Sequence, residues 1–409
     1  MMVGQTLYSH YAPSKPDRQT NDVSDQQPVR KIFIIAGEAS GDVLGFRLMQ
    51  ALRSLNPAID FTGIGGSRMM EAGLTSLFPM QELALMGLAE ILPKALHLKK
   101  RLAQTIVAIH AEKPDILLTI DSPGFTLRVL RAIGPGGPRR IHYVAPQVWA
   151  WRQKRVRHFP GLWDELLCLL PFEPAFFAPY GLNPVFTGHP VLESGADKGN
   201  AMRFRATYNL PAEALPLVLM PGSRITETKR LLPVFKDTVT RLQSDIPHLA
   251  PIIAAAAGIA DTVAAHVSDW PVKPLIVRDI ETRYDAFAAA SAALTKSGTS
   301  TLELAMAGVP MAVTYRVNPL SAAIGRRLIK VPHVAMINLL AQRALVPELL
   351  QEDCNPDRLA GTVTTLLRNS SSAQEQRAGF KAALASLRAP EGLPSLAAAR
   401  AVLKNQLSL

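Results

Sequence analysis

Residues 294–310 read LTKSGTSTLELAMAGVP, and this stretch decides which kind of fold the sequence predicts. An apolar strand end at 292–294 runs into a polar turn made of Lys296, Ser297, Gly298 and Thr299. Thr299 or Ser300 can cap the helix that follows, and Gly308 with Pro310 can stop it. Free N–H groups at a helix start, beside hydroxyls and a lysine, suit a phosphate. A plain strand–loop–helix corner, with Ser300 and Glu303 as a capping box, is the alternative.

Buried-strand patterns alternate with helical patterns in two successive sets along the chain. The first set spans 31–192 and begins with the apolar run KIFIIA; the second spans 200–388 and begins near the run LVLM. This alternation predicts an α/β protein of two Rossmann-like domains with mostly parallel sheets, and ligands at the carboxyl ends of the strands. The polar residues 1–30 read as a disordered extension, and 389–409 as a helix that can cross back to the first domain.

Composition limits the partners and the compartment. The chain has 409 residues and a formal charge of +11, with a pI of about 9.8. An excess of positive charge favours an anionic partner, which could be nucleic acid, a membrane surface or a phosphorylated substrate. The two cysteines, Cys168 and Cys354, form neither a disulfide framework nor a metal spacing, so a reducing cytoplasm fits. No run of 18 apolar residues predicts a membrane-spanning helix.

Asp121 is the candidate catalytic side chain of the first set. It follows the buried strand expected at 115–120 and precedes Pro123 and Gly124. A carboxylate at that place can take a proton from a hydroxyl, although an Asx turn or a helix cap would use the same residue type. The loop with Gly37, Glu38 and Ser40 lacks the GxGxxG spacing of a dinucleotide site. Its small residues allow a ligand to approach the backbone, and an ordinary βα turn is the alternative.

Cationic residues recur in three places. Arg224, in the turn PGSR, is a candidate for phosphate binding or a solvated side chain. Residues 149–158 (WAWRQKRVRH) mix aromatic and basic groups, as nucleic acid, an anionic membrane, a sugar phosphate or merely a solvated face would allow. Residues 77–101 pass from apolar to basic, which fits an interfacial segment or core packing. Since no D-x-D occurs, we expect cationic side chains and helix ends rather than a bridging metal to stabilise a leaving phosphate.

Eight blocks in order resemble the lipid-A-disaccharide synthase family, over residues 31–365. They are AGEASGD at 36–42, YVAPQVWAWRQKRV at 143–156, LPFEP at 170–174, GHP at 188–190, PGSR at 221–224, SGTSTLE at 297–303, Tyr315-Arg316, and PELLQ at 347–351. The block WAWRQKR is highly specific. The resemblance implies a GT-B glycosyltransferase that inverts configuration and needs neither metal nor cofactor.

The resemblance also implies substrates, a location and residue roles. The donor would be UDP-2,3-diacylglucosamine and the acceptor 2,3-diacylglucosamine 1-phosphate, joined β-1,6 at the inner face of the cytoplasmic membrane. An anionic membrane surface would be a partner and nucleic acid would not; a homodimer stays open. Asp121 would be the base, with Gly37, Glu38 and Ser40 on the acceptor side. Positions matched to the donor site are Arg224, Lys296, Ser297, Gly298, Thr299, Glu303, Arg316, Asn338 and Gln351. Positions matched to membrane or acyl-chain contact are Phe78, Met80, Leu85, Met86 and Leu88.

The chain also departs from the family, and other functions compete. Residues 1–30 have no counterpart, DSPGF stands where DAPDF is common, and APQ replaces SPS. The enzymatic rivals are other GT-B proteins, such as a UDP-N-acetylglucosamine 2-epimerase or a peptidoglycan glycosyltransferase. WAWRQKR and the segment 77–101 argue against them. A non-catalytic membrane-surface binding protein would need the basic and apolar patches but not Asp121.

Overall fold

The first half of the chain forms one parallel sheet. The computed structural model describes residues 29–84, 91–318, 322, 325 and 327–404. Within them, the first sheet has the strand order β3-β2-β1-β4-β5-β6-β7. The strands are β1 (Lys31–Ala36), β2 (Asp60–Ile64), β3 (Thr75–Ser76), β4 (Ile116–Ile120), β5 (Arg139–Tyr143), β6 (Glu165–Cys168) and β7 (Pro184–Phe186). Every residue of β4 is buried, as expected for a strand covered on both faces.

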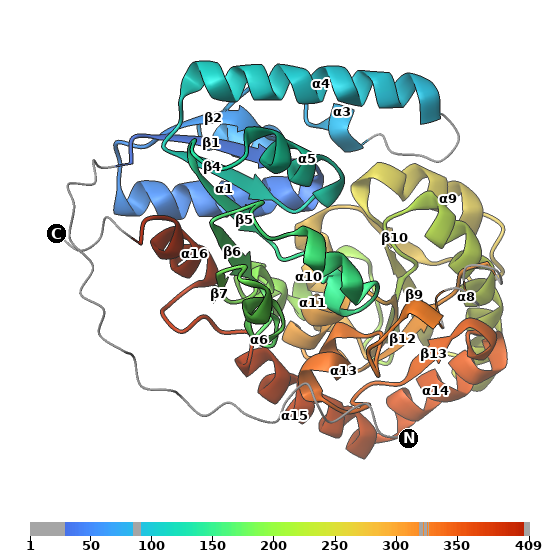
Figure 1. Ribbon diagram of the computed structural model, residues 1–409. Helices are drawn as coiled ribbons and strands as arrows, with labels where there is room; N and C mark the ends of the chain where they lie inside the picture. Colours follow the sequence, from blue (N-terminus) through green and yellow to red (C-terminus); the bar gives the residue numbers. More distant parts are fainter. Residues whose placement is uncertain (1–28, 85–90, 319–321, 323–324, 326, 405–409) are drawn as a thin grey trace.

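Helices cover both faces of this sheet. They are α1 (Ala39–Leu55), α2 (Ser67–Glu71), α3 (Gln81–Ala84), α4 (Ile91–Glu112), α5 (Pro123–Ile133) and α6 (Glu173–Phe177). α1 and α4 lie on opposite faces (Figure 1). This follows from topology, because right-handed crossovers that run in opposite directions from the centre of a sheet place their helices on opposite sides. The direction of winding reverses between β1 and β4, so the loops after these two strands flank the switch point.

The second sheet repeats the plan. In the described residues its strand order is β10-β9-β8-β11-β12-β13, all parallel, so its switch point lies between β8 and β11. The strands are β8 (Leu215–Met220), β9 (Leu249–Ala254), β10 (Leu275–Val277), β11 (Ala292–Lys296), β12 (Met311–Tyr315) and β13 (Glu348–Leu350). The helices are α7 (Ala201–Thr207), α8 (Ile225–Asp245), α9 (Ala260–Val267), α10 (Ile280–Ala289), α11 (Ser300–Met306), α13 (Met336–Ala341), α14 (Pro356–Arg368) and α15 (Ser370–Ala385).

Two connections tie the halves together. The segment between the two sheets forms short 3-10 turns, η4 (Pro190–Glu193) and η5 (Ala196–Lys198). The last described helix, α16 (Pro394–Val402), packs against α1 of the first half (Figure 1). Arg139 donates to the carbonyl of Val402 at 2.8 Å, which anchors the end of α16 to the first sheet. The last described helix therefore returns to the first domain.

Candidate active site

Asp121 lies at the switch point of the first sheet. Its N–H donates to the carbonyl of Tyr143 at 2.9 Å, which continues the β4–β5 ladder by one residue. Asp121 and Ser122 then adopt left-handed backbone angles, with φ of 46° and 47°. Two consecutive non-glycine residues in this region are uncommon and carry strain, which clusters at functional sites. The turn ends β4 abruptly, and α5 begins at once with Pro123.

Gly37 allows the loop after β1 to approach this turn. A Cβ built on Gly37 would lie 2.4 Å from the hydroxyl oxygen of Ser122, closer than any real side chain could lie. The next residue, Glu38, is exposed and accepts a hydrogen bond of 2.8 Å from the Ser40 hydroxyl. The acceptor-side residues predicted from the sequence thus lie beside the Asp121 turn. Asp42, which could have capped α1, instead accepts from the N–H groups of Gly66, Arg68 and Met69 at the start of α2.

The surroundings of Asp121 raise its pKa to about 6. Burial is the main cause, because it disfavours the charged carboxylate, and the negative charge of nearby Glu38 adds to it. The N–H of Ser122 acts in the opposite direction, since it stabilises the charged form. A carboxyl group with a pKa just below neutrality is mostly ionised at pH 7 yet binds a proton more readily than an ordinary aspartate. That is the property a general base requires.

The second sheet gathers cations at its own switch point. Arg224 follows β8 and Lys296 ends β11, the two strands that flank the reversal. Both reach the same carboxylate oxygen: Glu227 Oε1 lies 3.1 Å from Lys296 Nζ and 3.2 Å from Arg224 Nη1. Glu227 is in the first turn of α8 and mostly buried, whereas Arg224 is largely exposed. Glu227 was not among the predicted site residues, although its position three residues after Arg224 placed it on the first turn of the helix.

The turn after β11 has a different internal structure from the one expected. Thr299 is the N-cap of α11 but makes no side-chain capping bond, and Gly298 is absent from the residues with positive φ. The capping box is not formed, because the Glu303 carboxylate accepts a hydrogen bond of 3.1 Å from the Tyr284 hydroxyl. Ser297 donates to the carbonyl of Val334 at 2.8 Å. Lys296 to Thr299 nevertheless stand together at the end of β11, beside Arg224.

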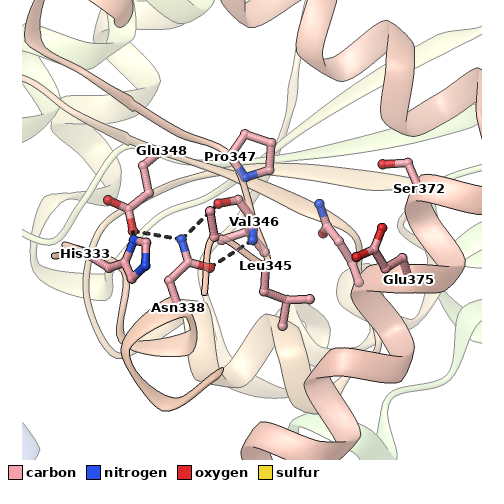
Figure 2. A pocket seen from close by; sticks show the side chains of 10 residues that line it. His333, Asn338, Leu345, Val346, Pro347, Glu348, Ser372 and Glu375 are labelled. Atoms are coloured by element: carbon pink, nitrogen blue, oxygen red, sulfur yellow. Dashed lines mark hydrogen bonds and ion pairs between the residues drawn. The ribbon is translucent and has the colours of Figure 1, made fainter. Parts of the chain in front are cut away.

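Arg316 and Gln351 also lie at this edge, since they follow β12 and β13. Arg316 is exposed, and the Gln351 side chain accepts from the N–H of Val317 at 3.3 Å. Asn338 differs: it is fully buried on α13, and its amide bonds with the backbone of Val346 and with Glu348 (Figure 2). The sequence predicted that Asn338 contacts the UDP-sugar donor. The geometry corrects this prediction, because the amide of Asn338 makes its hydrogen bonds with other residues of the protein.

Glu348 is the centre of the network that holds Asn338. Its carboxylate accepts from the N–H groups of Val334 and Ala335, both at 3.0 Å, and from Asn338 at 2.8 Å. His333 lies 3.8 Å away, and these side chains line a cavity of about 420 Å³ (Figure 2). The carbonyl of Val334 also accepts a hydrogen bond from the Ser297 hydroxyl. Glu348 therefore fixes the segment that contacts the turn after β11. Glu348 was not among the predicted site residues either, because its role depends on partners 10 to 14 residues earlier in the chain.

Two of the apolar residues predicted to contact the membrane are buried in the fold. Phe78 and Met80 are each 6% exposed and belong to the core of the first half, with Arg101 stacked over the Phe78 ring at 4.6 Å. Their predicted membrane contact is therefore corrected to core packing. Leu85, Met86 and Leu88 lie outside the described residues. In the part of the chain that the structure describes, no helix has the length and apolar character to cross a membrane.

Solved structures with similar folds share this architecture. A putative UDP-N-acetylglucosamine 2-epimerase from Listeria monocytogenes aligns with a TM-score of 0.61 at 12% identity, over 94% of this chain and 97% of its own. The glycotransferase of kitacinnamycin aligns at 0.60 and 16%, over 93% and 100%. With its two parallel α/β sheets, the protein therefore has the GT-B fold. This fold class includes glycosyltransferases and UDP-sugar epimerases.

Sequence relatives decide within the class. The family model described as Lipid-A-disaccharide synthetase matches residues 32–399. A lipid-A-disaccharide synthase of Granulibacter bethesdensis is 58% identical over 91% of this chain and 98% of its own length. One of Gluconobacter oxydans is 57% identical over 91% and 90%. The chain belongs to the lipid-A-disaccharide synthase family.

Proposed function

We propose that the protein joins UDP-2,3-diacylglucosamine to 2,3-diacylglucosamine 1-phosphate and releases UDP and a β-1,6-linked disaccharide 1-phosphate. Family membership supports the reaction. The observation that carries the mechanism is the division of charge between the two switch points: a carboxyl group of raised pKa on the first sheet, and paired cations on the second. A glycosyl transfer needs a base for the acceptor hydroxyl and positive charge for the departing diphosphate.

In this mechanism Asp121 takes the proton from the 6-hydroxyl of the acceptor as that oxygen attacks the anomeric carbon. The bond from this carbon to the UDP oxygen breaks, and the configuration inverts in a single displacement. Lys296 and Arg224 stabilise the charge that accumulates on the diphosphate, and Glu303 is assigned to the ribose hydroxyls. Glu227 pairs with both cations but offsets only one of their two positive charges, so a net positive charge remains for the diphosphate.

We also propose that the protein works at the cytoplasmic face of an anionic membrane. Both proposed substrates carry acyl chains, which hold them in a lipid bilayer, and the chain has a formal charge of +11. Basic proteins are attracted to anionic lipid surfaces. The enzyme therefore need not extract its substrates far from the membrane.

A product assay tests the reaction directly. The purified protein would be given both substrates in detergent, with EDTA present, and the products would be identified by mass spectrometry. Disaccharide 1-phosphate and UDP in equal amounts are expected. UDP without disaccharide would instead indicate a hydrolase or an epimerase-like enzyme, and product only after added Mg²⁺ would contradict the role given to Lys296 and Arg224.

A further inference from the structure

The loop that follows β5 is firmly anchored in the first half of the protein. Trp149 is 5% exposed, and its indole N–H donates to the buried Glu173 carboxylate at 3.1 Å. The Gln153 amide donates to the carbonyl of Trp149 at 2.9 Å, and Val156 and Phe159 are buried further along. Because these contacts fix the loop, the side chains between them have defined directions.

Those intervening side chains face solvent. Trp151 is 42% exposed, which is unusual for so large an apolar side chain, and the Arg152 guanidinium lies 4.6 Å from the centroid of its ring. The 3-10 turn η2 (Gln153–His158) then carries the basic side chains outward. The exposed basic residues of the loop are Arg152, Lys154, Arg155 and Arg157. The loop thus buries Val156 and Phe159 and presents one aromatic ring among positive charges.

The second half of the protein completes the same surface. Trp151 pairs with Ile329 in an isolated antiparallel bridge, and the N–H of Lys330 donates to the carbonyl of Ala150 at 2.9 Å. Ile329 is 44% exposed, and Arg327 and Lys330 are exposed beside it. We call this surface the junction patch; it comprises Trp151, Arg152, Lys154, Arg155, Arg157, Arg327, Ile329 and Lys330. No aspartate or glutamate occurs in residues 144–163 or 304–347, so neither stretch of sequence contributes a negative charge.

The junction patch lies at the edges of the sheets where the candidate site is found. Its first part follows β5, the neighbour of β4, which Asp121 follows. Its second part follows β12, the neighbour of β11, which ends at Lys296. A surface that combines exposed Trp and Ile with six basic residues matches the interfacial region of an anionic bilayer.

We propose that the junction patch is the face through which this protein docks on anionic lipid, with Trp151 and Ile329 entering the headgroup region. The proposal rests on the proposed function, since acylated substrates are what place the reaction at a bilayer. It moves the membrane contact away from Phe78 and Met80, which the fold buries, to a surface built by both halves of the chain. Docking there would bring the substrate-containing leaflet to the edge where Asp121 and Lys296 stand.

Flotation with vesicles of phosphatidylcholine and phosphatidylglycerol tests the docking face. The double variant Lys154→Glu/Arg155→Glu is expected to bind at least about 25-fold more weakly, at about fivefold for each basic residue removed from the surface. Trp151→Ala is a second, neutral variant that should also weaken binding. The matched control, Arg377→Glu/Lys381→Glu, makes the same charge change at exposed positions of α15 and should bind as the wild type does. Thermal melts of each variant confirm that the fold is retained.

A rival face is tested in parallel with Leu96→Glu/Lys99→Glu on α4, where Leu96 is 71% exposed. Release by the α4 variant with normal binding of the junction variants would overturn the proposal. So would binding of single-stranded DNA that displaces the vesicles and is lost in the same junction variants. Turnover is measured separately on detergent-dispersed substrates. A wild-type protein that floats with vesicles but forms no disaccharide would contradict the proposed function and leave the docking face standing.

Discussion

The two switch points treat charge in opposite ways, and the difference explains their division of labour. On the first sheet two carboxylates, Asp121 and Glu38, face each other and the pKa of Asp121 rises. On the second sheet Lys296 and Arg224 share the carboxylate of Glu227, so the cations are paired before any ligand arrives. Two like charges lie close together where a proton must be taken up, and a partly compensated positive charge lies where an anion must bind. Four variants test this difference between the two switch points.

Asp121→Asn removes the base and should lower kcat by about 10²–10⁴-fold, the usual contribution of a general base. Binding of UDP, measured by calorimetry, should stay unchanged because the second sheet is untouched.

The pH dependence of unfolding gives an independent check on Asp121. The folded pKa of Asp121 is raised from 3.8 to about 6, so the ionised side chain costs stability as pH rises through that range. The variant should be more stable than the wild type at pH 8, by up to about 3 kcal/mol, and equal to it below pH 4. Wild-type turnover in this variant would remove Asp121 from the mechanism.

Gly37→Ala should lower kcat by about 10–100-fold without touching a charged group. The added methyl would lie 2.4 Å from the Ser122 hydroxyl oxygen, so the strained turn that directs Asp121 must shift. Displacement of a catalytic group by about 1 Å costs a factor near 100. The control is Gly361→Ala on α14, where an added Cβ would meet nothing within 4 Å and the backbone φ is not positive. Equal activity of both alanine variants would show that the approach of the two loops is not needed.

Glu348→Ala should raise the KM for the donor by about tenfold and leave the pH dependence of kcat unchanged. The substitution leaves the N–H groups of Val334 and Ala335 without their acceptor, and a lost hydrogen bond to a charged group is worth about 1.5–3 kcal/mol. The segment that receives Ser297 would then loosen. Glu348→Gln keeps one acceptor oxygen and should recover part of the affinity. A change confined to kcat would assign Glu348 to the chemical step instead.

Glu38→Gln should have the smallest effect, a shift of the acid limb of the activity profile to lower pH. In the wild type the limb should lie near pH 6, because only ionised Asp121 can accept a proton. Removal of the neighbouring charge lowers the pKa of Asp121, but burial, the larger cause, remains. The limb is measured from kcat/KM against pH. A shift to higher pH would mean that Glu38 acts on Asp121 other than through its charge.

The strands and most of the site residues could be predicted from the sequence because both depend on local patterns. The continuous apolar runs that became β1 and β4 predict strands covered on both faces, and the polar residues that follow them must lie at the carboxyl ends of a parallel sheet. Asp121, Arg224 and Lys296 are found there for that reason. The prediction for Phe78 and Met80 was wrong, because an apolar run has the same sequence pattern whether it contacts lipid or a protein core.

The sequence alone was enough to predict the class of fold, the family, the two halves and the residues at the ends of their strands. Four features follow only from the folded structure: Glu38 lies close enough to perturb Asp121, Glu227 pairs with two cations, Asn338 faces inward, and Trp151 pairs with Ile329. Each of these is a contact between segments distant in the chain or a choice of side-chain direction. Local periodicity carries no information about either, because the free energy that selects them comes from packing and charge pairing across the whole fold.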